Sequence, residues 1–344
     1  MPRRLTSQQT VRLFILGLPA GLIITGIIAM FVYFRLERVR EERETRTLVS
    51  KALNEDDLRK QVHTLAGVIG PRHTGVPETI SSAKKYIQST LGPANLGYRV
   101  SRVEFEKEGQ PWHHLVIDLP GKNEKLWDEI VIVAASYDSA SNSPGADSSA
   151  TGISALMSLA QSFAGASADR TLRFVATVHD APPFAGTDGM GSLNYAATLR
   201  GRQEKVVAVV TLEGLGCYTD APGSQKIPAS PAAPYPDQGN FLAMVSNPQA
   251  QALTDSFKSR LTKSTALPLE IEASPAAGPL LGNSIAWAFD HAGFPVIRLT
   301  DTGDLRNPRW QQAGDTPETI DYPKFLEAVK AAEAVISRLL NPGR

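Results

Sequence analysis

The chain has 344 residues, of which 42% are hydrophobic, and it carries 35 basic and 35 acidic side chains. This length allows one large domain or two ordinary ones, and the hydrophobic content is typical of a folded protein rather than a disordered one. A net charge of zero gives the whole chain no electrostatic basis for binding nucleic acid, so we expect no such partner. The single cysteine, Cys217, excludes an intrachain disulfide and does not identify the compartment.

The N-terminal part has the pattern of a membrane anchor. Residues 1–12 form a short tail before an uncharged apolar run over residues 13–34. About 20 such residues cross the hydrocarbon core of a bilayer as a helix. A cleaved signal peptide is the alternative, but its apolar region is usually only about 7–15 residues long. The pattern therefore predicts a single-pass transmembrane helix and a membrane location.

The segment after the apolar run, residues 35–56, is rich in charge and contains no proline or glycine. Its mixed charges at helical spacing are typical of a solvated helical stalk. Five arginines follow the apolar run and three precede it, which favours a cytoplasmic position for the C-terminal part. A short tail before a large domain is nevertheless a common arrangement in the opposite orientation, so composition leaves the sidedness open.

The remaining residues, 57–344, have the pattern of an α/β domain. Helices are predicted at 58–68, 80–91, 152–163 and 321–340. Strands are predicted at 98–105, 115–119, 130–135, 172–178, 206–212, 241–245 and 295–299. Alternating strands and helices predict a mostly parallel central sheet flanked by helices. Ligands bind at the carboxyl ends of the strands in such sheets, so we expect the functional site there.

Four segments at these strand ends carry a resemblance. They are residues 135–139 with 145–152 (ASYDS and GADSSATG), 174–192 (FVATVHDAPPFAGTDGMGS), 212–216 (LEGLG) and 300–322 (TDTGDLRNPRWQQAGDTPETIDY). Their order, spacing and strand context resemble the zinc aminopeptidases of metallopeptidase family twenty-eight, whose fold is shared with glutaminyl cyclases. The resemblance covers roughly residues 57–340. It implies a zinc-aminopeptidase-like α/β fold and an extracytoplasmic domain.

The resemblance also implies a site with two zinc ions, which share a bridging carboxylate and a water. Zinc lowers the pKa of such a water and polarises the scissile carbonyl group. Three of the five expected ligands are replaced in this chain: Ser136 and Gln311 stand where the family has histidines, and Ala181 stands where it has an acid. None of these three residue types is a usual zinc ligand.

The resemblance matches four acidic residues to the family's site. Asp147 corresponds to the bridging ligand and Glu213 to a further ligand, and both are remnants of the metal site. Asp180 stands at the general-base position, one methylene shorter than the family's glutamate. Asp138 corresponds to a residue that does not touch the metal but orients a ligand histidine. We interpret the chain as a catalytically inactive pseudopeptidase that binds a peptide or protein partner, and we expect no cofactor.

Two alternatives remain open at this stage. Asp147, Asp180 and Glu213 could form a carboxylate cluster for zinc or one hard divalent cation, with His73 facing the same cleft. The chain would then be an active metal-dependent aminopeptidase or hydrolase with a remodelled site. The other alternative is a purely structural membrane protein that partners an active relative.

Overall fold

The computed structural model describes residues 50–226, 235–261, 264–273 and 281–343, with Leu48 and a few positions between 25 and 33. The chain divides into two compact units, Met1–Thr47 and Leu48–Arg344. Within the described part of the chain, no helix is long and apolar enough to cross a membrane. The predicted tail, 1–12, and nearly all of the predicted transmembrane run lie outside the described residues. Of the predicted stalk, 35–56, the structure describes residues 48 and 50–54, which are not helical, and residues 55–56, which begin the first helix of the domain.

The second unit is built on one sheet of eight strands, in the order β1-β2-β4-β3-β5-β8-β6-β7. The strands are β1 (Ser101–Lys107), β2 (Gln110–Leu119), β3 (Glu129–Ser136), β4 (Thr171–Thr177), β5 (Lys205–Leu212), β6 (Leu242–Ser246), β7 (Leu269–Ala273) and β8 (Val296–Thr300). The four central strands β4, β3, β5 and β8 run parallel. The neighbouring pairs β1–β2, β2–β4 and β6–β8 are antiparallel.

The sheet is therefore mixed: the centre and the edge pair β6–β7 are parallel, as expected, whereas β1, β2 and the β6–β8 junction are antiparallel. The reason lies partly in chain length. Only residues 108 and 109 separate β1 from β2, and so short a connection can only turn the chain back on itself. Pairs of neighbouring strands that are joined directly through a helix run parallel, namely β3–β4 through α4 and β6–β7 through α6, as the alternating pattern indicated.

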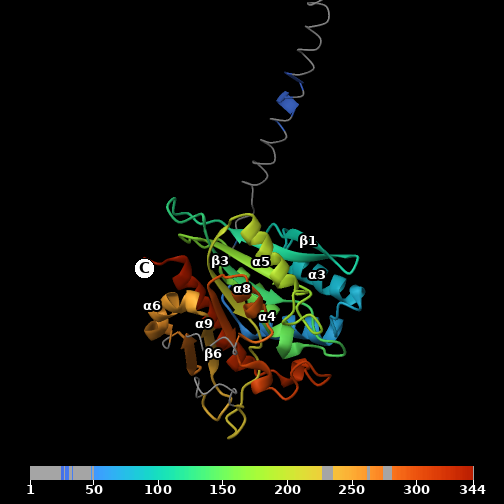
Figure 1. Cartoon of the computed structure of the whole chain (residues 1–344), viewed down its shortest axis with the longest axis vertical. Helices are drawn as coiled ribbons and strands as arrows, with labels where there is room; N and C mark the ends of the chain where they lie inside the picture. The colour runs from blue at the N-terminus through green and yellow to red at the C-terminus, as the bar shows by residue number, and fades with distance from the viewer. Residues whose placement is uncertain are drawn as a thin grey trace, which may run out of the picture. The chain divides into compact units, whose positions relative to one another are not determined.

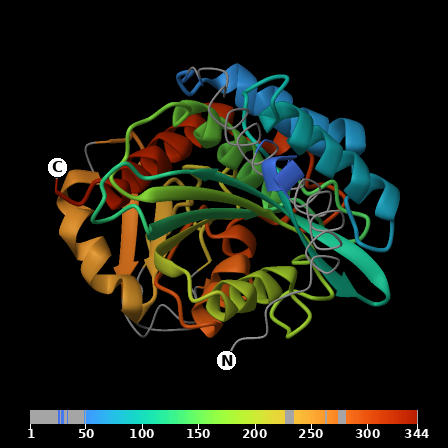
Figure 2. The same cartoon turned by 90° about the horizontal axis from the view of Figure 1, so that it is seen from above.

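Helices cover both faces of the sheet (Figures 1 and 2). They are α2 (Glu55–Val62), α3 (Pro77–Leu91), α4 (Thr151–Ser162), α5 (Gly191–Gly201), α6 (Gln251–Leu261), α8 (Ile285–His291) and α9 (Tyr322–Leu340). Helices α2, α3, α4 and α9 pack on one face, whereas α5 and α8 pack together on the other. Two hydrophobic cores result, one on each side of the sheet.

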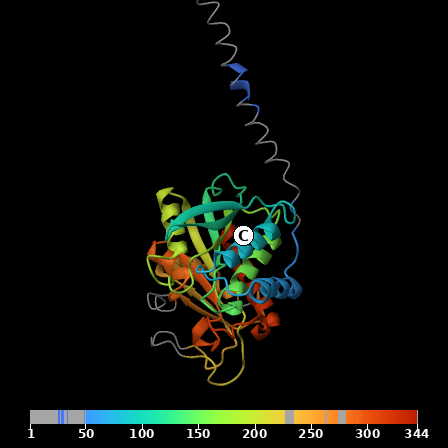
Figure 3. The same cartoon turned by 90° about the vertical axis from the view of Figure 1, so that its right-hand side faces the viewer.

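Strand β3 shows why the central strands are continuous apolar runs in the sequence. Its residues alternate between the two cores: Val131 and Val133 belong to the core under α4, while Ile132 and Ala134 belong to the core under α8. Successive side chains of a strand point to opposite faces, so a strand covered on both sides needs apolar residues throughout. Because β3, β4, β5 and β8 are parallel, their carboxyl ends meet at one edge of the sheet. The loops that follow β5 and β8 gather at that end of the unit (Figure 3).

Candidate functional site

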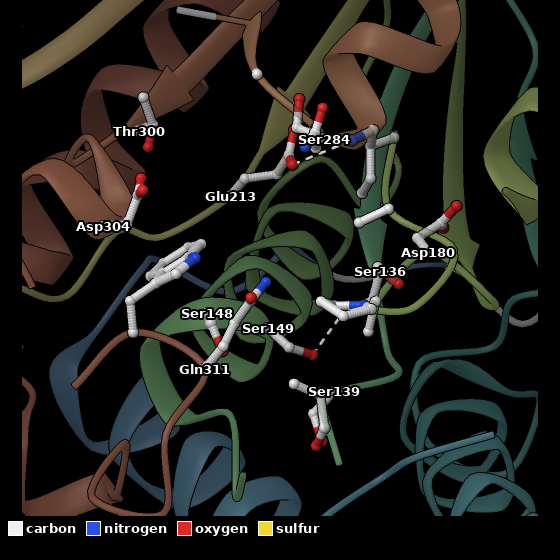
Figure 4. Close-up of a pocket in the computed structure, with 18 of the residues that line it drawn as sticks. Ser136, Ser139, Ser148, Ser149, Asp180, Glu213, Ser284, Thr300, Asp304 and Gln311 are labelled. Carbon is white, nitrogen blue, oxygen red and sulfur yellow. Dashed lines mark hydrogen bonds between the residues drawn. The ribbon is translucent and has the colours of Figure 1, made fainter. Parts of the chain in front are cut away.

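A cavity of about 800 Å³ lies at the carboxyl ends of the central strands (Figure 4). Sites for small ligands typically have volumes of about 300–1,000 Å³. The strand ends supply its walls through the loops that follow β3, β4, β5 and β8. Its lining includes every predicted site position except Asp147, namely Ser136, Asp138, Asp180, Ala181, Glu213 and Gln311.

Asp147 lies behind the wall of the cavity. It is fully buried, and its two carboxylate oxygens accept hydrogen bonds from the Gly216 amide at 2.9 Å and from Asn307 Nδ2 at 2.8 Å. Burial and the neighbouring acids Asp301 and Asp315 hold the pKa of Asp147 well above its ordinary value. The next residue, Ser148, lines the cavity instead. The position of this motif that faces the cavity therefore carries a hydroxyl group rather than a carboxylate.

Asp138 ties the end of β3 to the turn after β4. Its Oδ2 accepts hydrogen bonds from the backbone amides of Asp180 and Ala181, both at 2.9 Å. Its Oδ1 accepts a hydrogen bond from the Ser136 hydroxyl group. Burial raises the pKa of Asp138, and these hydrogen bonds oppose the rise. The hydroxyl that replaces the expected histidine is thus bonded to the acid that would have oriented that histidine.

The carboxyl group of Asp180 is directed toward the start of α5. Its Oδ1 accepts a hydrogen bond of 2.8 Å from the Ser192 amide in the first turn of that helix. Its Oδ2 is buried and makes no hydrogen bond with the described residues. Burial and the charge of Asp138 raise the pKa of Asp180 to about 7. In Figure 4, Asp180 and Glu213 lie on different sides of the cavity.

The close approach of α5 to this turn depends on a glycine. A Cβ atom at Gly191 would lie 1.9 Å from the carbonyl oxygen of Val178, a distance that no side chain tolerates. Gly191 is also the first residue of α5, so the helix begins directly against the end of β4. This contact brings the Ser192 amide within reach of Asp180, and it fixes the direction of the Asp180 carboxyl group.

Glu213 occupies the start of another helix. Its two carboxylate oxygens accept hydrogen bonds from the amides of Ile285 and Ala286, at 3.1 and 3.2 Å, in the first turn of α8. Negative charge is favourable at a helix N-terminus because the unpaired amides point outward there. The Nε atom of Arg298 lies 3.8 Å from Glu213 Oε1 and compensates the remaining charge. Each oxygen of the Glu213 carboxylate therefore already accepts a hydrogen bond from this chain.

Asp315 belongs to the same arrangement. It is fully buried, and its carboxylate accepts hydrogen bonds from the amides of Asp147 at 2.7 Å and Ser148 at 3.1 Å. Burial raises the pKa of Asp315, and these amide bonds lower it. The side chain holds the loop after β3 from a position 168 residues later in the chain.

Asp301, which sequence reasoning missed, does the same for the loop after β5. Its Oδ2 accepts hydrogen bonds from the amides of Gly216 at 3.1 Å and Cys217 at 2.7 Å, and its Oδ1 accepts one from Gly303 at 2.9 Å. The signal that could have found it is its position, directly after the last residue of β8. We call the six acids that accept backbone amides around the cavity the clamping acids. They are Asp138, Asp147, Asp180, Glu213, Asp301 and Asp315.

The residues present do not fit the zinc pair that the resemblance implies. Across the described ranges, no three His, Cys, Asp or Glu side chains lie close enough together to hold a metal ion. The hypothetical carboxylate cluster is not assembled, because Asp147 lies behind the wall, Asp180 turns to α5 and Glu213 turns to α8. His73 is not part of the described lining.

Comparisons with known proteins agree with this fold. The sequence profile described as "Peptidase family M28" matches residues 114–336. An uncharacterized protein of Escherichia coli (strain K12), YfbL, is 30% identical over 296 residues, covering 83% of this chain and 88% of that protein. The fold is that of the zinc aminopeptidases and glutaminyl cyclases, and the chain belongs to Peptidase family M28.

Two solved structures illustrate the likeness of fold. A zinc aminopeptidase from Bacillus subtilis, BSAP, superposes with a TM-score of 0.65 and 14% identity, covering 86% of this chain and 97% of that one. A glutaminyl cyclase of Fimbriiglobus ruber superposes with a TM-score of 0.59 and 18% identity, covering 84% of this chain and 96% of that one. At these identities the likeness concerns the fold alone.

Proposed function

We propose that the Leu48–Arg344 unit is a non-catalytic binding domain that holds a peptide or protein segment in the cavity without hydrolysing it. The observation that carries the proposal is that the clamping acids already accept hydrogen bonds from the chain itself. At each of the four acidic positions matched to the family's site, the carboxyl group accepts a hydrogen bond from at least one backbone amide or side-chain amide of this chain. A metal ion would have to share these carboxylates with the amides that they already bind, without help from a histidine.

The energetic argument follows from the number of these bonds. Each hydrogen bond to a charged group stabilises the fold by roughly 1.5–3 kcal/mol, and an orphaned buried amide costs a similar amount. Glu213 alone would forfeit two such bonds on turning toward a metal. The peptide class of ligand comes from the relatives, which are named as an aminopeptidase and a glutaminyl cyclase.

The first test is metal content. The full chain, purified in detergent, is incubated with zinc, desalted and measured by elemental analysis. We expect fewer than about 0.1 zinc ions per chain. An intact site of this kind binds zinc tightly and would keep it through desalting. One or two zinc ions per chain, together with release of amino acids from peptides, would overturn the proposal.

A second candidate function rests on Asp180. Its pKa of about 7 is in the range suited to a general base. In that case the chain would be a metal-dependent aminopeptidase or hydrolase whose activity disappears in Asp180→Asn. The metal measurement above, followed by a peptidase assay on the same sample, separates the two candidates.

We also propose that residues 13–34 anchor the chain as a single transmembrane helix, with the domain on the extracytoplasmic side. The support for the anchor is the length of the uncharged apolar run. Membranes containing the full chain should retain it after alkaline carbonate extraction, whereas a variant beginning at residue 48 should be released. Protease added to sealed cells should degrade the domain, and complete protection would reverse the orientation.

A further inference from the structure

The charges around the cavity are compensated almost everywhere. The lining contains four acids. Asp138 and Asp180 accept backbone amides, and Glu213 has two amides and Arg298 beside it. The fourth acid, Asp304, is exposed to solvent. An incoming ammonium group would therefore meet inner acids that already accept hydrogen bonds, and Asp180 Oδ2, which accepts none from the described residues, is buried.

The groups that the cavity does offer are neutral. Ser148 lines the cavity, and its Oγ is buried and has no hydrogen-bond partner among the described residues, so rotation of the side chain is needed to present the hydroxyl to a ligand. Gln311 presents a carboxamide, which both donates and accepts hydrogen bonds. Both residues line the cavity, and Figure 4 shows them on the same side of it. A hydroxyl and a carboxamide complement the N–H and C=O groups of a peptide unit.

An aromatic surface lies beside these polar groups. The ring of Trp310 packs against Gly214 and Gly303, where added Cβ atoms would come within 2.8 and 3.2 Å of the indole. Both glycines have positive φ angles, 65° and 57°. Two glycines thus seat the indole against the backbone and leave it in the wall of the cavity. An indole packs well against an uncharged side chain.

The loop that carries these groups is strained. Gln311 has a φ of 57° and Thr302 a φ of 80°, in the left-handed region that non-glycine residues rarely adopt. Such a conformation costs on the order of 1–3 kcal/mol and tends to persist at functional sites. The strain places a glutamine at the point where its side chain enters the cavity, although a glycine would fit the backbone better.

Resting on the proposed function, we infer that the cavity selects uncharged peptide segments rather than free amino termini. Ser148 and Gln311 bind the peptide unit and Trp310 packs against a neighbouring side chain. The ligand chemistry is that of an internal or N-terminally blocked peptide. Among the four acids of the described lining, Asp304 is the one exposed to solvent, and an amino-terminal ammonium group would pair with it.

The experiment uses two matched tetrapeptide libraries with amidated C-termini, one N-acetylated and one with free amino termini. Binding to the full chain in detergent is measured by competition, and the peptides recovered are analysed for cleavage. We expect the acetylated library to bind about tenfold more tightly, which corresponds to about 1.4 kcal/mol. Gln311→Ala and Ser148→Ala should each weaken that binding about tenfold, whereas the exposed neighbour in Gln312→Ala should leave it unchanged.

The other outcomes separate this inference from the function it rests on. Equal or tighter binding of free amino termini, lost in Asp304→Asn, would overturn the charge preference and leave peptide binding intact. No binding by either library, or cleavage of the free-amino peptides, would overturn the proposed function itself. Unchanged binding in Gln311→Ala, in a variant whose thermal unfolding matches the native chain, would also overturn the inference.

Discussion

The cavity is surrounded by two kinds of polar side chain, and they differ in what they contact. The clamping acids accept hydrogen bonds from backbone amides of the chain itself, for example Asp138 from Ala181 and Glu213 from Ala286. The neutral residues Ser148 and Gln311 also line the cavity, and the Ser148 hydroxyl has no partner in the described structure. The acids retained here are those with a role in holding loops together. A surviving acid is therefore weak evidence for surviving chemistry.

The largest expected effect comes from removing a clamping acid. Asp138→Ala leaves the buried amide of Asp180 and the half-buried amide of Ala181 without an acceptor. Each orphaned amide costs roughly 1–3 kcal/mol, so we expect the free energy of unfolding to fall by roughly 2–6 kcal/mol in urea titrations. The control Asp304→Ala removes an exposed acid of the same lining and should change the free energy of unfolding by less than about 0.5 kcal/mol. Equal effects of the two substitutions would contradict the comparison.

The next effect depends on pH. Asp180 has a pKa of about 7 in the fold, against an ordinary value near 3.8, so the unfolded chain releases this proton first. Stability from this group is complete below about pH 4, falls as the pH rises to about 7 and is lost above it. Relative to Asp180→Asn, the native chain should lose at most about 4 kcal/mol across that window. A constant difference between the two chains from pH 4 to 8 would refute the raised pKa.

A smaller effect is expected at the start of α8. Glu213→Gln keeps an oxygen acceptor for one amide but removes the negative charge from the helix N-terminus and from Arg298. The charge at such a position stabilises by roughly 0.3–2 kcal/mol, so the unfolding temperature should fall by a few degrees. Because this residue is a clamping acid in our account, zinc content should not change. A loss of bound zinc in this variant would restore Glu213 as a ligand.

The smallest effect has the opposite sign. Gln311→Gly relieves the left-handed backbone strain at φ 57°, and we expect it to raise the free energy of unfolding by up to about 1 kcal/mol. The same variant should lose the binding that Gln311 supports. A variant that is more stable and yet binds less well would show that the strained backbone at this position serves ligand binding rather than folding. A destabilised Gln311→Gly would show that the side chain serves the fold.

Much of the fold could be predicted from the sequence, because the central strands and the longest helix have strong patterns. Strands β3 and β5 are continuous apolar runs, and α9 begins within one residue of its predicted start. Helix α5 was missed because it opens on a glycine and has no regular apolar stripe. Helix α8 has only seven residues, and β7 carries acidic residues at alternate positions. Such short or polar segments are defined by what they pack against.

The positions of the candidate site were predictable, but the contacts of its side chains were not. Motif spacing placed Ser136, Glu213 and Gln311 on the cavity, since strand ends determine where loops lie. The spacing could not show that Asp147 turns away while Ser148 faces inward. The partners of the clamping acids are mainly backbone amides, which every residue except proline possesses. No residue type marks such a partner in the sequence.

The clamping acids have a consequence for the exchange of backbone hydrogens with solvent. Amides in loops usually exchange quickly, because transient openings expose them. Here the amides of Gly216 and Cys217 lie in the loop after β5, and those of Asp147 and Ser148 lie at the start of the short π-helix Ala146–Ala150, yet each donates to a buried carboxylate. Their deuterium uptake should be as slow as that of the neighbouring strands. The edge of the sheet that carries the cavity would then behave as a rigid frame, with loops that open only when the whole unit unfolds.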